Sequence, residues 1–229
     1  MKRLLLASAL LWSGVASAAD MPLKSLPATA YPTVKCGIYF GVNAEGKAGL
    51  VNGAPPGTTL IGGDVGGLVG YACPLGAFPW FAEFIADFQN LNASSNGFSL
   101  TGPAHLEERV GVQTPLIPFL TALGFPNLGT PMVPILPPGA APVGNPANYI
   151  YMAVNEDDIS ASQGLGVAHA WLISPEIGTG LLTTIKMGTL TFVSDTYAGV
   201  ELQTNSICLG AVMCPKLGVM AKVGESIKF

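Results

Sequence analysis

The sequence predicts an all-β protein, an antiparallel up-and-down transmembrane β-barrel, and three observations support this fold class. Hydrophobic residues make up 49% of the 229 residues and charged residues only 10%, against roughly 25% charged residues in ordinary soluble domains. Downstream of residue 18 no uninterrupted apolar run is long enough for a membrane-spanning helix. Residues 217–229 alternate apolar and polar side chains with the period of a β-strand. Because only helices and closed sheets satisfy their backbone hydrogen bonds in lipid, a membrane protein made from this chain must be a barrel.

The first 18 residues have the pattern of a cleaved signal peptide. Lys2 and Arg3 form a basic start, residues 4–15 are apolar, and residues 16–18 read Ala-Ser-Ala. The apolar run is shorter than the ~20 residues that cross a bilayer. Without this segment the chain holds eight Lys and Arg against fourteen Asp and Glu, a net charge of about −6, which argues against a nucleic-acid partner. Residues 19–33 are punctuated by proline and predict a periplasmic linker, and residues 34–229 the barrel.

The first half of the barrel is expected to hold strands near 35–44, 61–73, 79–90 and 104–113, with loops at 47–59 and 90–102. Strand 79–90 places aromatic and small residues on one face and carboxylates on the other, and strand 104–113 places charged side chains on a single face. Polar faces of barrel strands point into the lumen. We therefore predict a polar lumen cluster of Glu83, Asp87, Glu107 and Arg109, in a narrow interior that side chains fill.

The second half is expected to hold strands near 148–155, 165–173, 188–202 and 217–229, with an exposed loop at 156–158. Residues 114–146 contain nine prolines and no charged residue, which predicts an insertion. This gives eight strands. If part of 115–146 supplies a strand and Ser174-Pro175 is a turn, the count becomes ten. With a periplasmic C-terminus, the loops near 47, 91, 156 and 205 lie outside, and the insertion lies on the periplasmic side, where turns are normally short.

Four cysteines in an exported chain favour disulfides over free thiols. If strands 35–44 and 61–73 form an antiparallel hairpin, Cys36 and Cys73 lie at the same rim and on the same face. The remaining pair, Cys208 and Cys214, would close a small ring. A zinc site is the competing interpretation, but neither a C-x-x-C spacing nor a nearby His supports it.

Residues 37–44 read Gly-Ile-Tyr-Phe-Gly-Val-Asn-Ala, and strand 79–90 carries Glu83, Asp87 and Phe88. These two segments resemble the opening strand G-F-Y-x-G-x-N-A and the strand F-x-x-E-x-D-F of small outer-membrane β-barrels of the opacity-protein or surface-antigen family, porin-like proteins of alphaproteobacteria. The closing signature of outer-membrane barrels is matched by Lys222, Gly224, Ile227 and Phe229. The resemblance is strongest over 36–112 and 217–229. It implies a Gram-negative outer membrane, with lipid and the barrel-insertion machinery as partners.

Three functions fit this fold. The first is a structural and surface-contact role, in which outer loops meet a partner that the sequence does not specify. The second is a small passive channel for solutes. The third is a lipid-modifying enzyme at the rim with His105 or His169 as base, but neither has a Ser beside it on the same strand face. We expect no enzyme activity and no cofactor or metal, because the glycine run at 62–67 lacks a phosphate-loop spacing and the acidic triplet at 156–158 lacks alternating calcium ligands.

Overall fold

The computed structural model describes residues 36–75, 78–113, 141–143, 147–209, 214 and 216–229. The predicted signal peptide, the linker and most of the proline-rich insertion lie outside these residues. No helix in the described part of the chain is long and apolar enough to cross a membrane. The strands are β1 (Gly37–Asn52), β2 (Thr59–Leu75), β3 (Phe78–Ser95), β4 (Phe98–Gln113), β5 (Ala141–Pro142), β6 (Ala147–Gln163), β7 (Gly166–Met187), β8 (Leu190–Leu202) and β9 (Lys216–Lys228).

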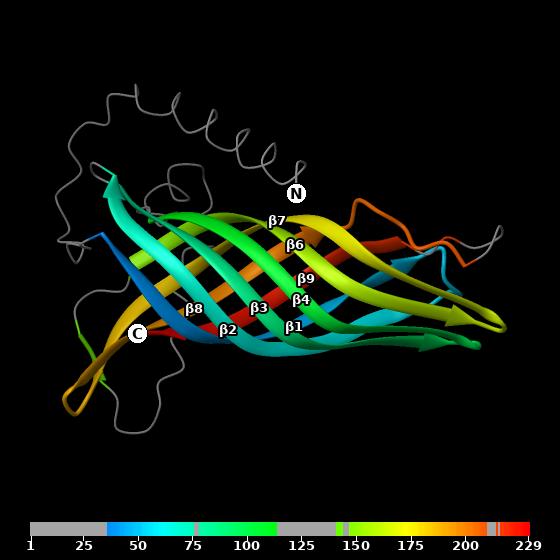
Figure 1. Ribbon diagram of the computed structural model, residues 1–229, viewed down its shortest axis with the longest axis horizontal. Coiled ribbons are helices and arrows are strands. Elements are labelled where there is room, and N and C mark those ends of the chain that lie inside the picture. The colour runs from blue at the N-terminus through cyan, green and yellow to red at the C-terminus, as the bar shows by residue number, and fades with distance from the viewer. Residues whose placement is uncertain (1–35, 76–77, 114–140, 144–146, 210–213, 215) are drawn as a thin grey trace. The chain divides into compact units, whose positions relative to one another are not determined.

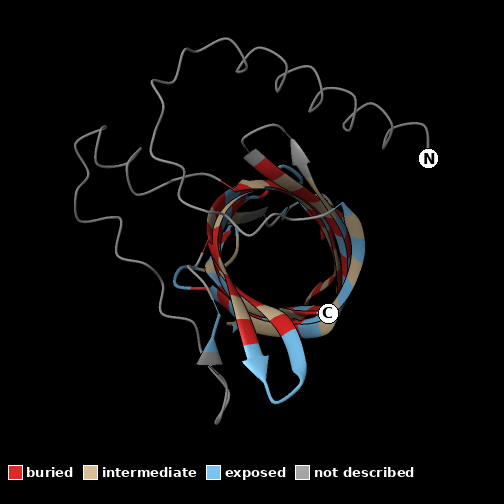
Figure 2. Ribbon diagram, turned by 90° about the vertical axis from the view of Figure 1, so that its left-hand side faces the viewer, coloured by how far each residue is buried: buried red, intermediate tan, exposed pale blue. Residues whose placement is uncertain are grey.

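The eight long strands close into a barrel, which Figure 1 shows from the side and Figure 2 nearly end-on. The order around the ring is β1-β2-β3-β4-β6-β7-β8-β9, and β9 pairs with β1 to close it. Every neighbouring pair is antiparallel. The all-β, up-and-down prediction with eight strands is therefore confirmed over the ten-strand alternative.

The connections alternate between the two ends of the barrel. One end, here called the terminal end, holds the start of β1, the last residue Phe229 and the connections at 76–77, 114–146 and 188–189. The opposite end, the loop end, holds the connections at 53–58, 96–97, 164–165 and 203–215. The proline-rich insertion thus joins β4 to β6 at the terminal end. The part of it that is described, β5, pairs with Ile185 and Lys186 of β7.

Three expected loops are strand in the structure, and the sequence interpretation was wrong there. β1 continues through Lys47 to Asn52, and the acidic triplet 156–158 lies inside β6. The expected loop at 90–102 is instead the tip of a hairpin whose two-residue turn is Asn96-Gly97, with φ values of 46° and 77°, as a primed turn requires. The physical reason is that the polarity of the two faces changes in these outer segments. In the hairpin at 90–102, Leu91, Phe98 and Leu100 are buried inside the barrel while Asn90 and Asn92 are exposed, and in the acidic triplet both faces are polar. Backbone pairing continues there although the outward-apolar pattern of the membrane-facing segments is lost.

Side chains alternate between an apolar exterior and a polar interior. Exposed apolar side chains occur on all eight long strands, and Phe88 is 82% exposed. The exposed set includes Ile38, Phe40, Val42, Val65, Val69, Phe84, Val110, Ile150, Met152, Trp171, Ile173, Ile177, Val200, Val219 and Val223. A surface of this kind is far more apolar than the scattered residues of a soluble domain. The alternation of burial around the ring is visible in Figure 2.

Candidate functional site: the charged interior of the barrel

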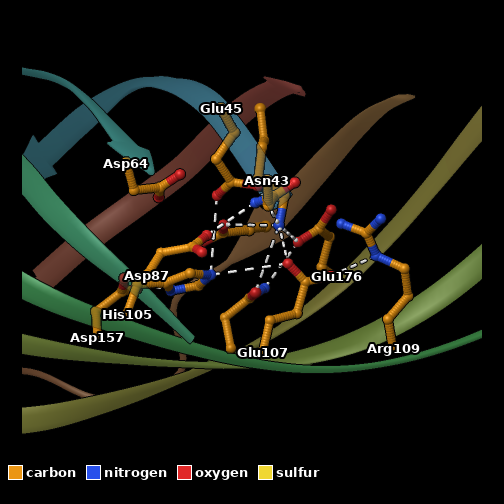
Figure 3. A network of polar contacts seen from close by, with 12 residues as sticks. Asn43, Glu45, Asp64, Asp87, His105, Glu107, Arg109, Asp157 and Glu176 are labelled. Carbon is orange, nitrogen blue, oxygen red and sulfur yellow. Dashed lines mark hydrogen bonds and ion pairs between the residues drawn. The ribbon is translucent and has the colours of Figure 1, made fainter. Parts of the chain in front are cut away.

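The interior of the barrel holds an unusual number of buried charges. All eight long strands contribute, because inward positions recur at every second residue. Nine carboxylates face four permanent cations: Glu45, Asp64, Glu83, Asp87, Glu107, Asp157, Glu176, Asp195 and Glu201 against Lys47, Arg109, Lys222 and Lys228. His105 is buried among them. Figure 3 shows part of this network.

Lys222 of β9 lies at the centre of the network. Its Nζ is 2.7 Å from Oε2 of Glu107 and 2.5 Å from Oε2 of Glu176, and the three side chains are 0% exposed. β9 and β4 are separated by three strands in either direction around the ring. The ion pair between Lys222 and Glu107 therefore crosses the full width of the barrel.

Lys47 of β1 forms a second bridge across the barrel. Its Nζ lies 3.4 Å from Oδ1 of Asp157 on β6, the strand opposite β1 in the ring. It also lies 3.3 Å from Glu45 and 3.5 Å from Glu201. The two lysines thus tie opposite walls together by two separate routes.

The network continues toward the terminal end through Arg109. Its Nε donates a hydrogen bond to Glu107 at 2.6 Å, and its guanidinium lies 4.5 Å from the ring centre of Tyr151 and 4.0 Å from that of Tyr197. Such stacking favours a desolvated cation. The hydroxyl of Tyr149 donates to Asp195 at 2.7 Å. Charged groups and tyrosines therefore share one packed layer.

Packed side chains lie on both sides of the charged layer. Toward the terminal end, Phe81 joins the buried tyrosines in one cluster, with its ring centre 5.0 Å from that of Tyr149. Toward the loop end a larger aliphatic cluster fills the interior, with Val51, Leu60, Leu91, Phe98, Leu100, Ile159, Leu172 and Met220. Side chains occupy the interior over its length, as expected for eight strands.

The predicted lumen residues all face inward. Glu83, Glu107 and Arg109 come together, with Arg109 Nη1 3.7 Å from Glu83 Oε2. Asp87 instead accepts a hydrogen bond from Asn43 at 2.8 Å. The sequence interpretation missed Lys47 and Asp157, because both lay in segments taken as loops. Continuing the inward period of β1 and β6 by a few residues would have found them.

The C-terminal residues have separate environments. Lys222 is in the charged network, and Gly224 lies against the ring of Tyr197. Ile227 pairs with Val42 of β1. Phe229 is 71% exposed, and its backbone N–H donates to the carbonyl of Phe40 at 2.8 Å.

The cysteines form two disulfides, Cys36–Cys73 at the terminal end and Cys208–Cys214 in the connection between β8 and β9. These are the two pairs expected from the hairpin argument. The zinc interpretation of the cysteines does not apply, since all four are oxidised.

The two histidines contact carboxylates. Nδ1 of His105 lies 3.0 Å from Asp157, and the outward-facing His169 contacts Asp158. A lipid-modifying enzyme would need a serine hydroxyl at hydrogen-bond distance from its base. Among the described residues, the hydrogen-bond and ion-pair partners of the two histidines are Lys47 and carboxylates, and no serine is among them.

The solved structures that are similar to this chain share little of its sequence. No family profile and no curated protein matches the sequence. Among solved structures, the chain is similar to Neisserial surface protein A, with a TM-score of 0.35, 9% identity, and coverage of 84% of this chain and 97% of that one. The outer membrane protein OprG from Pseudomonas aeruginosa gives a TM-score of 0.30 and 11% identity, with 85% and 97% covered. The TodX ΔS2S3 mutant monoaromatic hydrocarbon channel gives 0.22 and 9%, with 87% and 92% covered. At these TM-scores the barrel assignment rests on the strand pairing of this chain.

Proposed function

We propose that this protein is an outer-membrane β-barrel of a Gram-negative bacterium with a structural and surface-contact role, whose lumen is closed rather than conducting. The observation that carries the proposal is the pair of fully buried lysine bridges, Lys222 to Glu107 and Lys47 to Asp157, that join opposite walls. Parting such a pair would leave two desolvated charges without partners, which costs several kcal/mol. A solute path through this layer would have to break both bridges.

The apolar exterior supports the membrane location. A closed ring of strands satisfies its own backbone hydrogen bonds, and the exposed aliphatic and aromatic side chains of the eight strands suit lipid. Cleavage of residues 1–18 as a signal peptide and export through the inner membrane belong to the same proposal. The opening and closing motifs favour the opacity or surface-antigen family and insertion by the barrel-assembly machinery.

Planar-bilayer recordings test the closed lumen. We expect the purified, folded protein to give no steady single-channel steps under conditions in which a porin of larger strand number conducts, because eight strands leave an interior filled by side chains. The folded state is checked by its heat-modifiable gel mobility before each recording. Regular, persistent steps that scale with protein amount would contradict the proposal and favour the passive channel.

The surface-contact role requires the loop end to face outward from the cell. We expect a Cys introduced as Leu165→Cys, in the exposed β6–β7 turn, to react with a membrane-impermeant maleimide on intact cells. The matched control is Thr189→Cys, in the exposed turn between β7 and β8 at the terminal end, which should react only after the outer membrane is permeabilised. If Thr189→Cys reacts on intact cells and Leu165→Cys does not, the terminal end faces outward and the surface-contact role of the loop end is contradicted.

An outward-facing carboxylate tests the lipid contact itself. Glu108 is exposed on β4, between Phe84 of β3 and Val154 of β6 in the apolar band. Charged side chains on the lipid face destabilise barrels most at the bilayer midplane. We expect Glu108→Leu to raise the free energy of unfolding in phospholipid vesicles by about 1 kcal/mol, measured by urea titration. Glu156→Leu is the matched control. Glu156 lies on β6, two residues from Val154 toward the loop end, and its replacement should raise the free energy of unfolding by less. A loss of stability in Glu108→Leu would place this part of the wall outside lipid.

A further inference from the structure

We propose that Glu45, Asp64 and His105 form a divalent-cation site inside the barrel, of the kind that binds Zn²⁺. The three side chains come from β1, β2 and β4 and are all buried. One ligand atom of each lies within 4.8 Å of the others. Imidazole nitrogen and carboxylate oxygen are both zinc ligands, and three protein ligands leave the fourth position for a water molecule. Figure 3 shows the three groups together.

Asp64 and His105 each direct an atom without a hydrogen-bond partner into the site. Neither carboxylate oxygen of Asp64 has a hydrogen-bond partner, although the side chain is 0% exposed. Its nearest described cation, Lys47 Nζ, is 3.6 Å away, beyond hydrogen-bond distance. Nε2 of His105 is also buried without a hydrogen bond, and Oε1 of Glu45 lies 3.3 Å from Lys47 Nζ. Because buried polar atoms without partners are costly, a cation bound here would satisfy Asp64 and His105 and share Glu45 with Lys47.

The strand register places like charges directly opposite each other at this point. Glu45 and Asp64 are partners across the β1–β2 pair. Like charges at opposing positions destabilise a sheet. A cation between the two carboxylates converts that repulsion into attraction.

His105 is oriented as a metal-bound histidine is. Asp157 Oδ1, at 3.0 Å, is placed to accept a hydrogen bond from Nδ1–H, and this tautomer leaves the lone pair of Nε2 between Glu45 Oε1, 3.8 Å away, and Glu107 Oε2, 3.7 Å away. A carboxylate behind the imidazole is the usual second contact of a zinc-binding histidine. The ammonium group of Lys47 lies 3.1 Å from Nδ1 and can only donate, so this tautomer requires it to turn toward Asp157 and Glu201, with which it already forms ion pairs.

The charge of the interior favours an added cation. Nine buried carboxyl groups outnumber the four permanent cations of the interior. A bound divalent ion offsets part of this excess in a region of low dielectric, where uncompensated charge is most expensive. The imidazole selects against Ca²⁺ and Mg²⁺, which prefer oxygen ligands.

Metal analysis of the folded barrel tests the site. The mature chain, without a histidine tag, is folded in detergent with Zn²⁺, dialysed extensively and analysed by mass spectrometry of the metal. All proteins carry His169→Ala, so that the outward-facing His169–Asp158 pair cannot bind zinc. We expect about one Zn²⁺ per barrel in this background and an affinity at least about tenfold lower in Asp64→Asn. Ca²⁺ in place of Zn²⁺ should not be retained.

The matched control is Asp87→Asn, a buried carboxylate on the next strand that already accepts a hydrogen bond from Asn43 and lies outside the three-residue set. It should retain zinc. In metal-free detergent Asp64→Asn should unfold at no lower temperature than its parent, because the change removes a buried carboxyl group that makes no hydrogen bond and faces Glu45 across the β1–β2 pair. Zinc should raise the melting temperature only of the parent and of Asp87→Asn. Equal zinc in the parent and in Asp64→Asn, or none in the parent, would overturn the proposal. If Asp64→Asn fails to fold, His105→Gln replaces it with the same expected loss.

Discussion

Replacing Lys222 with Met should lower the free energy of unfolding by about 3–5 kcal/mol, because it removes one partner of a buried ion pair. The Nζ of Lys222 is within 2.7 Å of Glu107 and 2.5 Å of Glu176, and it is 3.6 Å from Glu45. After the change these carboxylates stay desolvated while their shared cation is gone. Arg109 remains beside Glu107, with its guanidinium stacked on two tyrosine rings. Among the described ion pairs, Lys222 is the one cation of Glu176, so this carboxylate loses its partner.

Urea titration in phospholipid vesicles measures this loss. The protein is refolded from urea without any assembly factor, so that a defect in recognition by the insertion machinery cannot contribute. Lys186→Met is the matched control, since Lys186 is exposed at the terminal end of β7, and it should change stability by no more than about 0.5 kcal/mol.

A second substitution identifies the source of the loss. Glu107→Gln combined with Lys222→Met should be less destabilising than the sum of the two single changes, because the unpaired carboxylate is then absent. Strict additivity would show that the two side chains do not act as a pair. If Lys222→Met lowers the free energy of unfolding no more than Lys186→Met does, the ion pairs of Lys222 do not stabilise the barrel.

Much of the wall of this barrel could be predicted from sequence. Strand 79–90 is clear, because its outward residues are aromatic or small while Glu83, Asp87 and Gln89 recur on the inward face. The outer half of β6 is not, because Glu156 and Asp158 face outward while Asp157 faces inward. When both faces are polar, period-two alternation carries no signal, and only the strand pairing reveals the strand.

The interior network was harder to predict from sequence, for a different reason. The predicted partners Glu107 and Arg109 are two positions apart on one strand, so their proximity follows from local periodicity alone. The contact of Lys222 with Glu107 joins residues 115 positions apart on opposite walls. Its existence depends on closure of the ring and on the relative register of eight strands, and no local pattern encodes either one.

The C-terminal strand combines a packing role with a proposed assembly role in neighbouring residues. A Cβ on Gly224 would enter the space of the Tyr197 ring. That ring cannot move freely, because Tyr197 is buried and its hydroxyl lies 2.8 Å from Oε2 of Glu45 and 2.7 Å from Oδ1 of Asn43. Packing against Tyr197 therefore explains why this position of the closing motif holds glycine. Phe229, by contrast, is exposed, and its described side-chain contact is with Phe192, at 6.4 Å between ring centres.

These two residues should respond in opposite ways to the same pair of measurements. Gly224→Ala should lower the free energy of unfolding by about 1–3 kcal/mol in vesicles, because it overpacks a rigid site. Phe229→Ala should stay within about 0.5 kcal/mol of the parent there, as surface changes do, but should reduce the amount of folded protein in the outer membrane of cells, because the proposed role of Phe229 is recognition during insertion. Ile38→Ala, another exposed apolar residue at the terminal end, controls for simple loss of lipid contact and should reach the outer membrane normally. Normal outer-membrane levels of Phe229→Ala would refute that role, whereas a large loss of stability in vesicles would mean that Phe229, like Gly224, is needed for packing and that the closing motif reflects the fold alone.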